Sequence, residues 1–518
     1  MDTNLGQVEL VKDINPEVFE DGSPLDSYPD SLVEFNDKLY FAANDGETGR
    51  ALFVSDGTTD GTQLVTDVFP ENNSQSRFYF SNLSNLTEFN DKLYFASDNG
   101  ESGKELFVTD GTAEGTQLVK DIYPGEDNYG NKNSSSPDYL TEFNGKLYFT
   151  AQDDANGEEL FVSDGTAEGT QLVVNIDQGV GDYSRQFDDF NTRNLFEFND
   201  QLYFKGNNGE SGEELFVTDG TAEGTQLVKD IYPGENQYGY ENSSTPGNFV
   251  EFNDKLYFSA NDGVHGNELF VSDGTAEGTQ LLVDLREETD SYGYGSRPSD
   301  LLEFNDKLYF AADDGESREL YVSDGTAEGT QLLVDLNPGE NQYGNSYSSD
   351  PNNLVEFNGK LYFTADDGEH GTELYVSDGT AEGTQLVADL NPGENSAFSP
   401  DSLFATNLTV VGDELFFGAD NGTVGTELFK LTADDSSGGT SVSITGSDGE
   451  DIFVLRSGEY FDKIHDFDLG SDRFGLADGL QFEDLSFAGN TILADEKVLV
   501  NLEGINAEQL TAIDFDTI

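Results

Sequence analysis

The sequence predicts an all-β fold: an eight-bladed β-propeller of four-stranded antiparallel blades, closed by an N-terminal strand and followed by a small, β-roll-like C-terminal domain. Three observations support this prediction. A segment of 51 to 55 residues recurs seven times, each copy contains four strand-like runs, and the two ends of the repeat region resemble the halves of an eighth copy. A fixed period of this size is typical of solenoids, propellers and arrays, and a propeller blade has four strands.

An Asp-Gly-Thr triplet marks each repeat. The segment that contains it, ELFVTDGTAEGTQLVKDI, is identical at residues 105–122 and 214–231. The Asp of the triplet recurs at Asp56, Asp110, Asp164, Asp219, Asp273, Asp324 and Asp378. The triplet lies in a turn rich in Gly and Asp, so we expect its carboxylate to accept hydrogen bonds from nearby backbone N–H groups rather than to bind a metal.

The first two runs of each repeat predict a hairpin. They resemble LVEF at residues 32–35 and KLYFAA at residues 38–43. An Asn-Asp or Asn-Gly pair joins them, as at Asn144 and Gly145, and such pairs tolerate the positive φ angles of a tight hairpin turn.

The third and fourth runs complete the blade. The third run is apolar on both faces, with Leu106 and Val108 on one and Phe107 on the other, as a sheet between two neighbouring blades requires. The fourth run carries Lys120 and Asp121. Charges on a strand suit an outer edge, where they block pairing with another chain.

The two ends of the repeat region set the number of blades. Residues 6–16 resemble a fourth strand without the preceding three, and residues 407–431 resemble three strands without a fourth. Joined, they give an eighth blade and close the ring. An alternative phasing starts each blade at its LVKDI run and needs no exchange. It is less favoured because the long, variable linkers, such as residues 123–139, would then lie inside a blade.

The repeat resembles a bacterial family named for its consensus, ELWxxDGTxxGT…VKDI, over roughly residues 7–431. Phe or Tyr replaces the consensus Trp, as at Phe107, Phe216 and Tyr321, and the chain has no Trp. This resemblance implies the propeller fold for residues 1–431 and leaves the biochemical role open.

The pattern changes after Leu431. Residues 432–443 read as a linker, and residues 444–518 as a separate C-terminal domain. This domain contains GSDGEDIF, which fits most of the calcium nonapeptide G-G-x-G-x-D-x-U-x, and FDKIHDFDLGSDRFGL at residues 461–476. Both segments are similar to those of repeats-in-toxin proteins, which bind Ca²⁺ in a parallel β-roll and leave the cell by type I secretion with an uncleaved C-terminal signal.

The resemblance implies a Ca²⁺ site in this domain, with Asp451 as the nonapeptide carboxylate and glycines at the turn. Ca²⁺ takes six to eight oxygen ligands, which Asp side chains and turned backbone carbonyls supply. The expected metal-site residues are Gly446, Asp448, Gly449, Asp451, Asp466, Asp468 and Asp472. The alternative is a small β-domain with acidic loops and no metal.

Composition narrows the partners and the location. The chain has 103 acidic and 24 basic residues, a formal net charge of −79, which repels nucleic acid and anionic membrane surfaces. It has no Cys, so it forms no disulfides. We see neither an N-terminal signal peptide nor an apolar run of membrane-spanning length. With the resemblance, this predicts a bacterial secreted or cell-surface protein that uses the type I secretion machinery.

No catalytic residue is apparent. His265 and His370 occupy the same variable loop position as Thr48 and Ser102, so we interpret them as solvated loop residues. Catalysis needs one asymmetric site, whereas the acidic residues recur in nearly every blade. We therefore predict a protein that is not an enzyme.

The long linkers supply the ligand-binding candidates. They combine Tyr with Asn, Ser and Gly, which gives flat stacking surfaces and adaptable hydrogen bonds suited to sugars. The candidates are Tyr129, Tyr238, Tyr240, Tyr343 and Tyr347. The alternative is that these linkers are solvated and their Tyr side chains pack on the adjacent blade.

We therefore predict an extracellular or cell-surface scaffold or adhesion protein that contacts surface glycans or matrix polysaccharide, or self-associates into a surface layer or fibril. The alternative is an extracellular polysaccharide hydrolase or lyase with its site at the propeller channel. A carboxylate or His cluster unique to one blade, at one mouth of the channel, would favour that alternative.

Overall fold

The computed structural model describes residues 7–19, 22–69, 83–176, 193–286, 294–341, 343–391 and 408–432, together with the strands of the C-terminal region and the single residues 482 and 510. The chain divides into two compact units, of which one spans Val8–Thr432 and the other contains the strands from residue 444 onward. Every named element of the described residues is a β-strand. No helix among them has the length and apolar character needed to cross a membrane.

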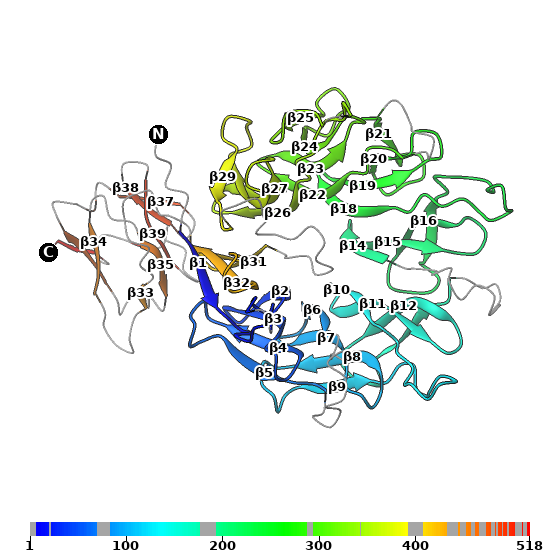
Figure 1. Ribbon diagram of the computed structural model, residues 1–518, viewed down its shortest axis with the longest axis horizontal. Helices are drawn as coiled ribbons and strands as arrows, with labels where there is room; N and C mark the ends of the chain where they lie inside the picture. The colour runs from blue at the N-terminus through cyan, green and yellow to red at the C-terminus, as the bar shows by residue number, and fades with distance from the viewer. Residues whose placement is uncertain are drawn as a thin grey trace. The chain divides into compact units, whose positions relative to one another are not determined.

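Blades 1 to 4 follow one another along the chain (Figure 1). Blade 1 contains β2 (Asp30–Phe35), β3 (Lys38–Asn44), β4 (Arg50–Ser55) and β5 (Gln63–Thr66). Blade 2 contains β6 (Ser84–Glu88), β7 (Leu93–Asp98), β8 (Lys104–Thr109) and β9 (Gln117–Lys120). Blade 3 contains β10 (Asp138–Phe143), β11 (Lys146–Asp153), β12 (Gly157–Ser163) and β13 (Gln171–Val174). Blade 4 contains β14 (Arg193–Phe198), β15 (Gln201–Asn207), β16 (Glu213–Thr218) and β17 (Gln226–Lys229).

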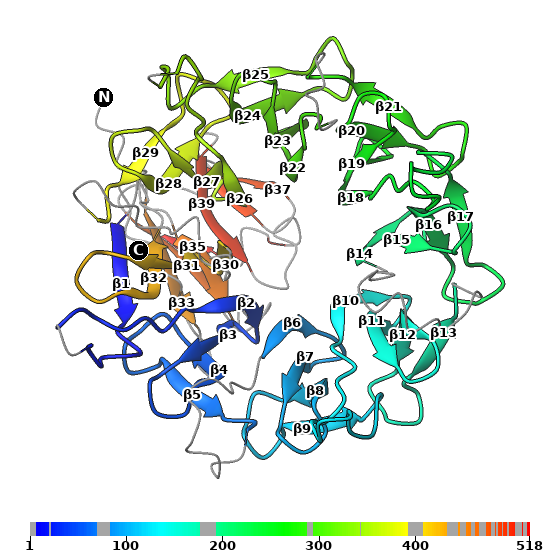
Figure 2. The ribbon, with the colours of Figure 1, turned by 45° about the vertical axis from the view of Figure 1, so that its right-hand side comes forward.

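Blades 5 to 8 complete the ring (Figure 2). Blade 5 contains β18 (Gly247–Phe252), β19 (Lys255–Asn261), β20 (Asn267–Ser272) and β21 (Gln280–Val283). Blade 6 contains β22 (Ser299–Phe304), β23 (Lys307–Asp313), β24 (Arg318–Ser323) and β25 (Gln331–Val334). Blade 7 contains β26 (Asn352–Phe357), β27 (Lys360–Asp366), β28 (Thr372–Ser377) and β29 (Gln385–Ala388). Blade 8 contains β30 (Thr409–Val411), β31 (Glu414–Asp420), β32 (Thr426–Thr432) and β1 (Gln7–Lys12).

The ring closes by strand exchange, as the two terminal fragments predict. β1 is hydrogen-bonded to β32 as the outermost strand of blade 8. The Ile14 N–H, just after β1, donates to the Glu427 carboxylate at 2.8 Å. The predicted eight-bladed ring with an N-terminal closing strand is therefore confirmed, and the alternative phasing is wrong.

Apolar strands sandwich the hydrophobic core between neighbouring blades. Leu106 and Val108 of β8 pack against Phe149 of blade 3, whereas Phe107 packs against Phe35 and other residues of blade 1. Both faces of the third strand are therefore buried, as its sequence predicts. Each blade thus depends on both neighbours for its core.

The hairpin turns have the backbone that the sequence predicts. In blade 3 the pair Asn144 and Gly145 has φ angles of 51° and 70°, and in blade 2 the pair Asn90 and Asp91 has 51° and 56°. Asn, Asp and Gly tolerate this left-handed region better than other residues do.

The Asp of each triplet fixes its own turn. Asp219 Oδ1 accepts hydrogen bonds from Thr221 N at 2.9 Å and from Thr221 Oγ1 at 2.7 Å. The same pair of bonds recurs at Asp56, Asp110, Asp164, Asp273, Asp324 and Asp378. These bonds lower the pKa of the carboxyls of Asp56, Asp110, Asp164, Asp219, Asp273 and Asp324. The predicted turn-capping role is confirmed.

The Gly of the triplet lets neighbouring blades interlock. Gly274 in blade 5 has a φ angle of +89°, and a Cβ atom there would lie 2.5 Å from the hydroxyl oxygen of Tyr203 in blade 4. In the next pair of blades, the Tyr257 hydroxyl donates to the Gly325 carbonyl at 3.3 Å. Only glycine allows both the left-handed backbone and this close approach.

The charged fourth strand also joins blades. Lys120 Nζ of blade 2 donates to the carbonyl of Thr170 in blade 3, and Lys12 Nζ of blade 8 donates to that of Thr62 in blade 1 at 2.6 Å. These lysines tie the outer strand of one blade to the next blade, in addition to placing charge on an edge strand.

The C-terminal unit contains two sheets. The first has the strand order β33 (Ile444–Thr445), β35 (Phe461–His465), β39 (Lys497–Leu502), β38 (Thr491–Ala494) and β37 (Leu485–Ala488). The second has the order β34 (Ile452–Arg456), β36 (Arg473–Ala477) and β40 (Phe515–Thr517). The strands β33 to β36 alternate between the two sheets, and β33–β35 and β34–β36 pair in parallel. This winding is the one expected of a parallel β-roll.

Candidate functional site

The loops of the propeller divide between two faces. Successive strands of a blade are antiparallel, so the loops between second and third strands lie at the same end as the linkers between blades. We call this end the linker face. The turns between first and second strands and the Asp-Gly-Thr turns lie at the opposite end.

The seven predicted Ca²⁺-site residues of the C-terminal unit lie outside the described residues. They are Gly446, Asp448, Gly449, Asp451, Asp466, Asp468 and Asp472. Among the residues that the structure describes, no group of three or more His, Asp or Glu side chains is arranged to hold a metal ion.

The two propeller histidines belong to loop turns. His265 Nδ1 lies 2.7 Å from Asp262 Oδ2, and His370 Nδ1 lies 2.7 Å from Asp367 Oδ2. These hydrogen bonds raise the pKa of both imidazoles. In blade 1, Thr48 makes the equivalent hydrogen bond with Asp45. Histidine therefore has the same role as threonine at this position, as the hydrogen-bond partner of the loop Asp.

The most regular feature of the linker face is a set of four small hairpins within the linkers. Each has one isolated antiparallel bridge, at Val18–Pro24, Glu126–Lys132, Glu235–Glu241 and Glu340–Ser346. Their backbone hydrogen bonds correspond one to one; for example, Asp127 N donates to Asn131 O at 2.8 Å and Asn341 N donates to Asn345 O at 2.8 Å.

Three of these hairpins present a tyrosine at the same tip position. Tyr129, Tyr238 and Tyr343 are 91%, 76% and 79% exposed. The residue two positions earlier fixes each tip, because its side-chain oxygen accepts a hydrogen bond from the tyrosine N–H, as Asp127 does for Tyr129 at 2.7 Å. The predicted alternative, packing on the adjacent blade, is wrong for these three side chains. We call them the tip tyrosines.

The other two candidate tyrosines belong to the same hairpins but lie away from the tips. Tyr240 is 56% exposed and Tyr347 is 46% exposed, and neither is at the tip position. Tyr347 N instead donates to Gly339 O at 3.1 Å and helps to close its hairpin.

The four described hairpins share a motif, which the sequence analysis missed. They follow the outer strands β1, β9, β17 and β25, which belong to blades 8, 2, 4 and 6. The signal is in the sequence: PGEDNYG at residues 124–130 recurs as PGENQYG at 233–239 and 338–344, two blades apart each time.

Recurring glutamates at the start of the third strand have a structural role. Glu105 accepts hydrogen bonds from Ile122 N at 2.9 Å and Ser135 N at 3.0 Å, and also from the Ser135 hydroxyl. Burial raises the pKa of Glu105 to about 7, against these three donors. The equivalent residues are Glu159, Glu214, Glu268, Glu319, Glu373 and Glu427. These carboxylates hold each linker onto its blade.

The residue just before this glutamate differs from blade to blade. In chain order it is Arg50, Lys104, Glu158, Glu213, Asn267, Arg318, Thr372 and Thr426. In three blades its side chain reaches the first residue of the innermost strand: Arg50 pairs with Asp30, Lys104 Nζ donates to Ser84 Oγ at 2.9 Å, and Arg318 Nη2 donates to Ser299 Oγ at 2.6 Å. The residue types on the linker face therefore vary near the inner strands.

A cavity of about 690 Å³ opens among these variable positions. We call it the linker-face cavity. Its lining comes from blades 4, 5 and 6 and from the linkers that precede blades 5, 6 and 7. The lining includes Asn194, Asn248, Ser259, Asn261, Asn267, Tyr294, Arg297, Ser299, Arg318 and Asp350. The sequence analysis named none of these residues, because they converge only when the blades are arranged in a ring.

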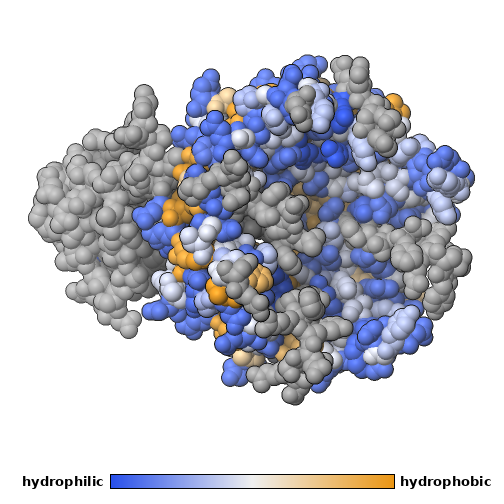
Figure 3. Space-filling view, viewed as in Figure 1, coloured by the Kyte–Doolittle hydropathy of each residue, from blue (hydrophilic) through white to orange (hydrophobic). Residues whose placement is uncertain are grey.

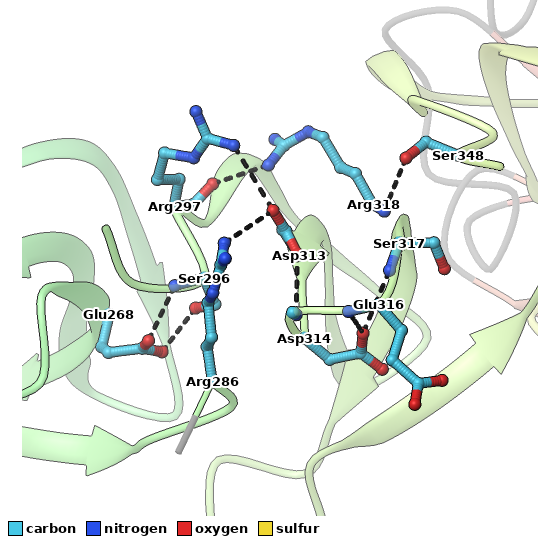
Figure 4. A network of polar contacts seen from close by, with 11 residues as sticks. Glu268, Arg286, Ser296, Arg297, Asp313, Asp314, Glu316, Ser317, Arg318 and Ser348 are labelled. Carbon is cyan, nitrogen blue, oxygen red and sulfur yellow. Dashed lines mark hydrogen bonds and ion pairs between the residues drawn. The ribbon is translucent and has the colours of Figure 1, made fainter. Parts of the chain in front are cut away.

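A polar network supports one side of the cavity (Figure 4). Asp313 Oδ2 lies 3.0 Å from Arg286 Nη1 and 3.4 Å from Arg297 Nη2. Arg318 Nη1 donates to the Arg297 carbonyl at 2.9 Å. Burial raises the pKa of the nearby Asp350 carboxyl, and the charge of Arg318 opposes that shift. Positive and negative side chains therefore meet at one place on the rim.

Comparisons with known proteins identify no family and no activity for this chain. No family model matches the chain, and no curated protein does. Among solved structures, the chain is similar to the computationally designed protein Ika8, with 16% identity, 82% of this chain and 99% of that chain covered, and a TM-score of 0.43.

Two peptidase structures are also similar. Oligopeptidase B from Leishmania major is 9% identical, with 83% of this chain and 56% of that chain covered and a TM-score of 0.43. The β-propeller domain of the trilobed protease from Pyrococcus furiosus is 11% identical, with 71% and 100% covered and a TM-score of 0.38. At these values the likenesses give no information about activity.

Proposed function

We propose that this protein is a non-enzymatic extracellular or cell-surface scaffold or adhesion protein that contacts glycans or matrix polysaccharide through repeated loops. The observation that carries the proposal is the set of tip tyrosines, Tyr129, Tyr238 and Tyr343, at equivalent positions on alternate blades. An exposed ring offers a flat apolar face, and the Asn and Ser residues around it offer hydrogen bonds. That combination suits sugar rings.

Repetition strengthens the argument. A single exposed tyrosine needs no explanation, because isolated apolar side chains are common on protein surfaces. Three tyrosines held by the same turn geometry offer three similar weak sites on one rigid ring. Weak sites linked in this way bind a repetitive partner with high avidity. The described surface visible in Figure 3 is largely hydrophilic.

The C-terminal unit supports the extracellular part of the proposal. Its strands β33 to β36 wind as those of a parallel β-roll do. We propose that Ca²⁺ binds at the acidic turns of residues 446–472 after export and that this unit serves type I secretion. The net charge of −79 favours cation binding in the same way.

The test is binding of the purified chain to a glycan array and to immobilised matrix polysaccharides. Tyr238→Ser is compared with Val264→Ser, which removes a loop side chain that is 70% exposed and lies off the hairpins. The triple variant Tyr129→Ser/Tyr238→Ser/Tyr343→Ser should lose binding by about tenfold or more, because avidity is lost. Unchanged binding of the triple variant to every ligand would overturn the proposal. Sedimentation of the same variants tests whether the protein instead self-associates into a surface layer or fibril.

A second candidate is an extracellular polysaccharide hydrolase or lyase. The linker-face cavity favours it, since its polar lining is asymmetric in a ring of similar blades and includes Asp350, whose pKa is raised by burial. Turnover of a polysaccharide by the purified chain, abolished by Asp350→Asn and retained by the triple tyrosine variant, would replace the scaffold proposal with this one.

A further inference from the structure

The linker-face cavity is unusual in this chain because guanidinium groups line it. The chain carries 103 acidic and only 24 basic residues, yet Arg297 and Arg318 both line the cavity, and Arg286 lies beside them. Asp350 is the one acidic residue of the lining. In a chain with a net charge of −79, a cavity with this lining calls for a specific explanation.

Arg318 keeps donors for a ligand. Its guanidinium bonds to two neutral acceptors, the Arg297 carbonyl at 2.9 Å and Ser299 Oγ at 2.6 Å, and it makes no ion pair with any described residue. A guanidinium carries five N–H donors, so these bonds leave several of them. The two bonds also fix its orientation, as a preorganised anion-binding group requires.

Arg297 is the more accessible of the two. Its side chain is 54% exposed, and its guanidinium carbon lies 5.6 Å from the centre of the Tyr294 ring. Its 3.4 Å contact with Asp313 is looser than the 3.0 Å contact between Asp313 and Arg286. Because Arg286 already neutralises Asp313, Arg297 can turn to a bound anion at small electrostatic cost.

The rest of the lining is polar and uncharged. Asn261 and Asn267 contribute side-chain amides, and Asn248 is held by hydrogen bonds from its Nδ2 to Ser259 Oγ at 3.2 Å and to the Pro298 carbonyl at 3.1 Å. Those bonds use the Asn248 Nδ2 donors and leave its side-chain Oδ1 as an acceptor. Amides of this kind pair with hydroxyl groups, and Tyr294 adds an aromatic face.

We infer that the linker-face cavity binds a carboxylated saccharide, such as a uronic acid residue of an acidic polysaccharide. Arg297 and Arg318 hold the carboxylate, the asparagines hold ring hydroxyls, and Tyr294 contacts the sugar ring. Because Asp313 and Asp350 lie close by, a carboxylate with a single charge is favoured over a phosphate dianion. A neutral sugar offers Arg318 no carboxylate to accept a bidentate pair of hydrogen bonds.

This inference deepens the proposed glycan contact but depends on different residues from the tip tyrosines. It is tested with the full chain by calorimetric titration with trimers of galacturonate, glucuronate and mannuronate, with galactose trimer and inorganic phosphate as comparisons. The variants are Arg297→Gln and Arg318→Gln. The matched control is Lys132→Gln, which removes one exposed cation from the blade 2 hairpin.

At least one uronate trimer should bind, and each arginine variant should weaken that binding by roughly 10- to 100-fold, since a hydrogen bond to a charged group is lost. Lys132→Gln should bind as the parent does. If Arg318→Gln fails to fold, Arg297→Gln still decides, because its side chain is half-exposed.

Three results would overturn the inference: no binding of any uronate trimer at millimolar concentration, equal binding of galactose trimer or phosphate, or arginine variants that bind as the parent does. The glycan-array test is independent of these results. Unchanged array binding of the triple tyrosine variant refutes the tip-tyrosine proposal alone. Failure of the arginine variants to weaken uronate binding refutes the cavity proposal alone.

Discussion

The interlock between blades predicts a large loss of stability when Gly274 is replaced by alanine. The φ angle of +89° costs a residue with a Cβ atom about 1–2 kcal/mol. The new Cβ would also lie 2.5 Å from the Tyr203 hydroxyl oxygen, and overpacking of this kind costs about 1–3 kcal/mol. Gly274→Ala should therefore lower the free energy of unfolding of the propeller by about 2–5 kcal/mol.

The chain offers a matched control for the backbone part of this cost. Gly145 has a φ angle of +70° and nothing within 4 Å of its hypothetical Cβ atom. Blade 1 has Asp37 at the equivalent turn position, with a φ angle of 56°, so a side chain is tolerated there. Gly145→Ala should cost only about 1–2 kcal/mol.

A second substitution isolates the interlock itself. Tyr203→Phe removes the oxygen that the new methyl group would strike, and the next ring atom, Tyr203 Cζ, would be 3.6 Å away. In the Tyr203→Phe background, Gly274→Ala should therefore cost about as much as Gly145→Ala does in the parent. The two substitutions should couple favourably, as neighbouring sites do.

Calorimetry is the appropriate assay, because the chain has no Trp to report unfolding. For a propeller of this length, each kcal/mol shifts Tm by about 1 °C, so the parent and Gly274→Ala should differ by about 2–5 °C. Equal costs for Gly274→Ala and Gly145→Ala, or no coupling with Tyr203→Phe, would refute the interlock.

Three further predictions concern ring closure, pH and calcium. Deleting residues 1–16 should lower the melting temperature and expose a strand edge, and a synthetic peptide of residues 6–16 should restore it; an unchanged melting curve would contradict strand closure. The stabilising contribution of the buried glutamates should be greatest below the ordinary Glu pKa of 4.5 and should decline as pH rises from 4.5 to about 7 to 8. The decline is about 1.4 kcal/mol per pH unit for each of Glu105, Glu214, Glu319 and Glu427, and Glu214→Gln should flatten this slope at matched ionic strength. Ca²⁺ should raise the melting temperature of the C-terminal unit in the full chain more than Mg²⁺ or NaCl does at equal ionic strength, and Asp451→Ala should remove that difference; equal effects of the three salts would indicate screening alone.

The fold was predictable because it depends on local patterns that repeat. Alternating apolar runs, the Asn144-Gly145 type of turn and the Asp-Gly-Thr triplet each have a local physical reason, and seven copies reinforce one another. The strand exchange followed from the complementary ends, and residues 7–12 do form the outermost strand of blade 8.

The site was harder to predict because its residues are distant in sequence. Arg318 and Asn248 belong to different blades and meet only because inner strands converge at one face. The tip tyrosines were found from composition, but their common tip position was not, because it depends on the backbone hydrogen bonds that close each hairpin.

Constant and variable positions of the ring have different physical consequences. Gly274 and Glu105 have equivalents in seven of the eight blades and contact a neighbouring blade or a linker, so a substitution there strains an interface that most blades share. The residues before the third-strand glutamates vary in type, and one of them, Arg318, lines the linker-face cavity. A ring of identical blades would present only identical sites, which suit a repetitive partner. Variation at the rim breaks that equivalence, so the proposed saccharide site in the linker-face cavity and the proposed repeated contacts of the tip tyrosines can coexist on one ring.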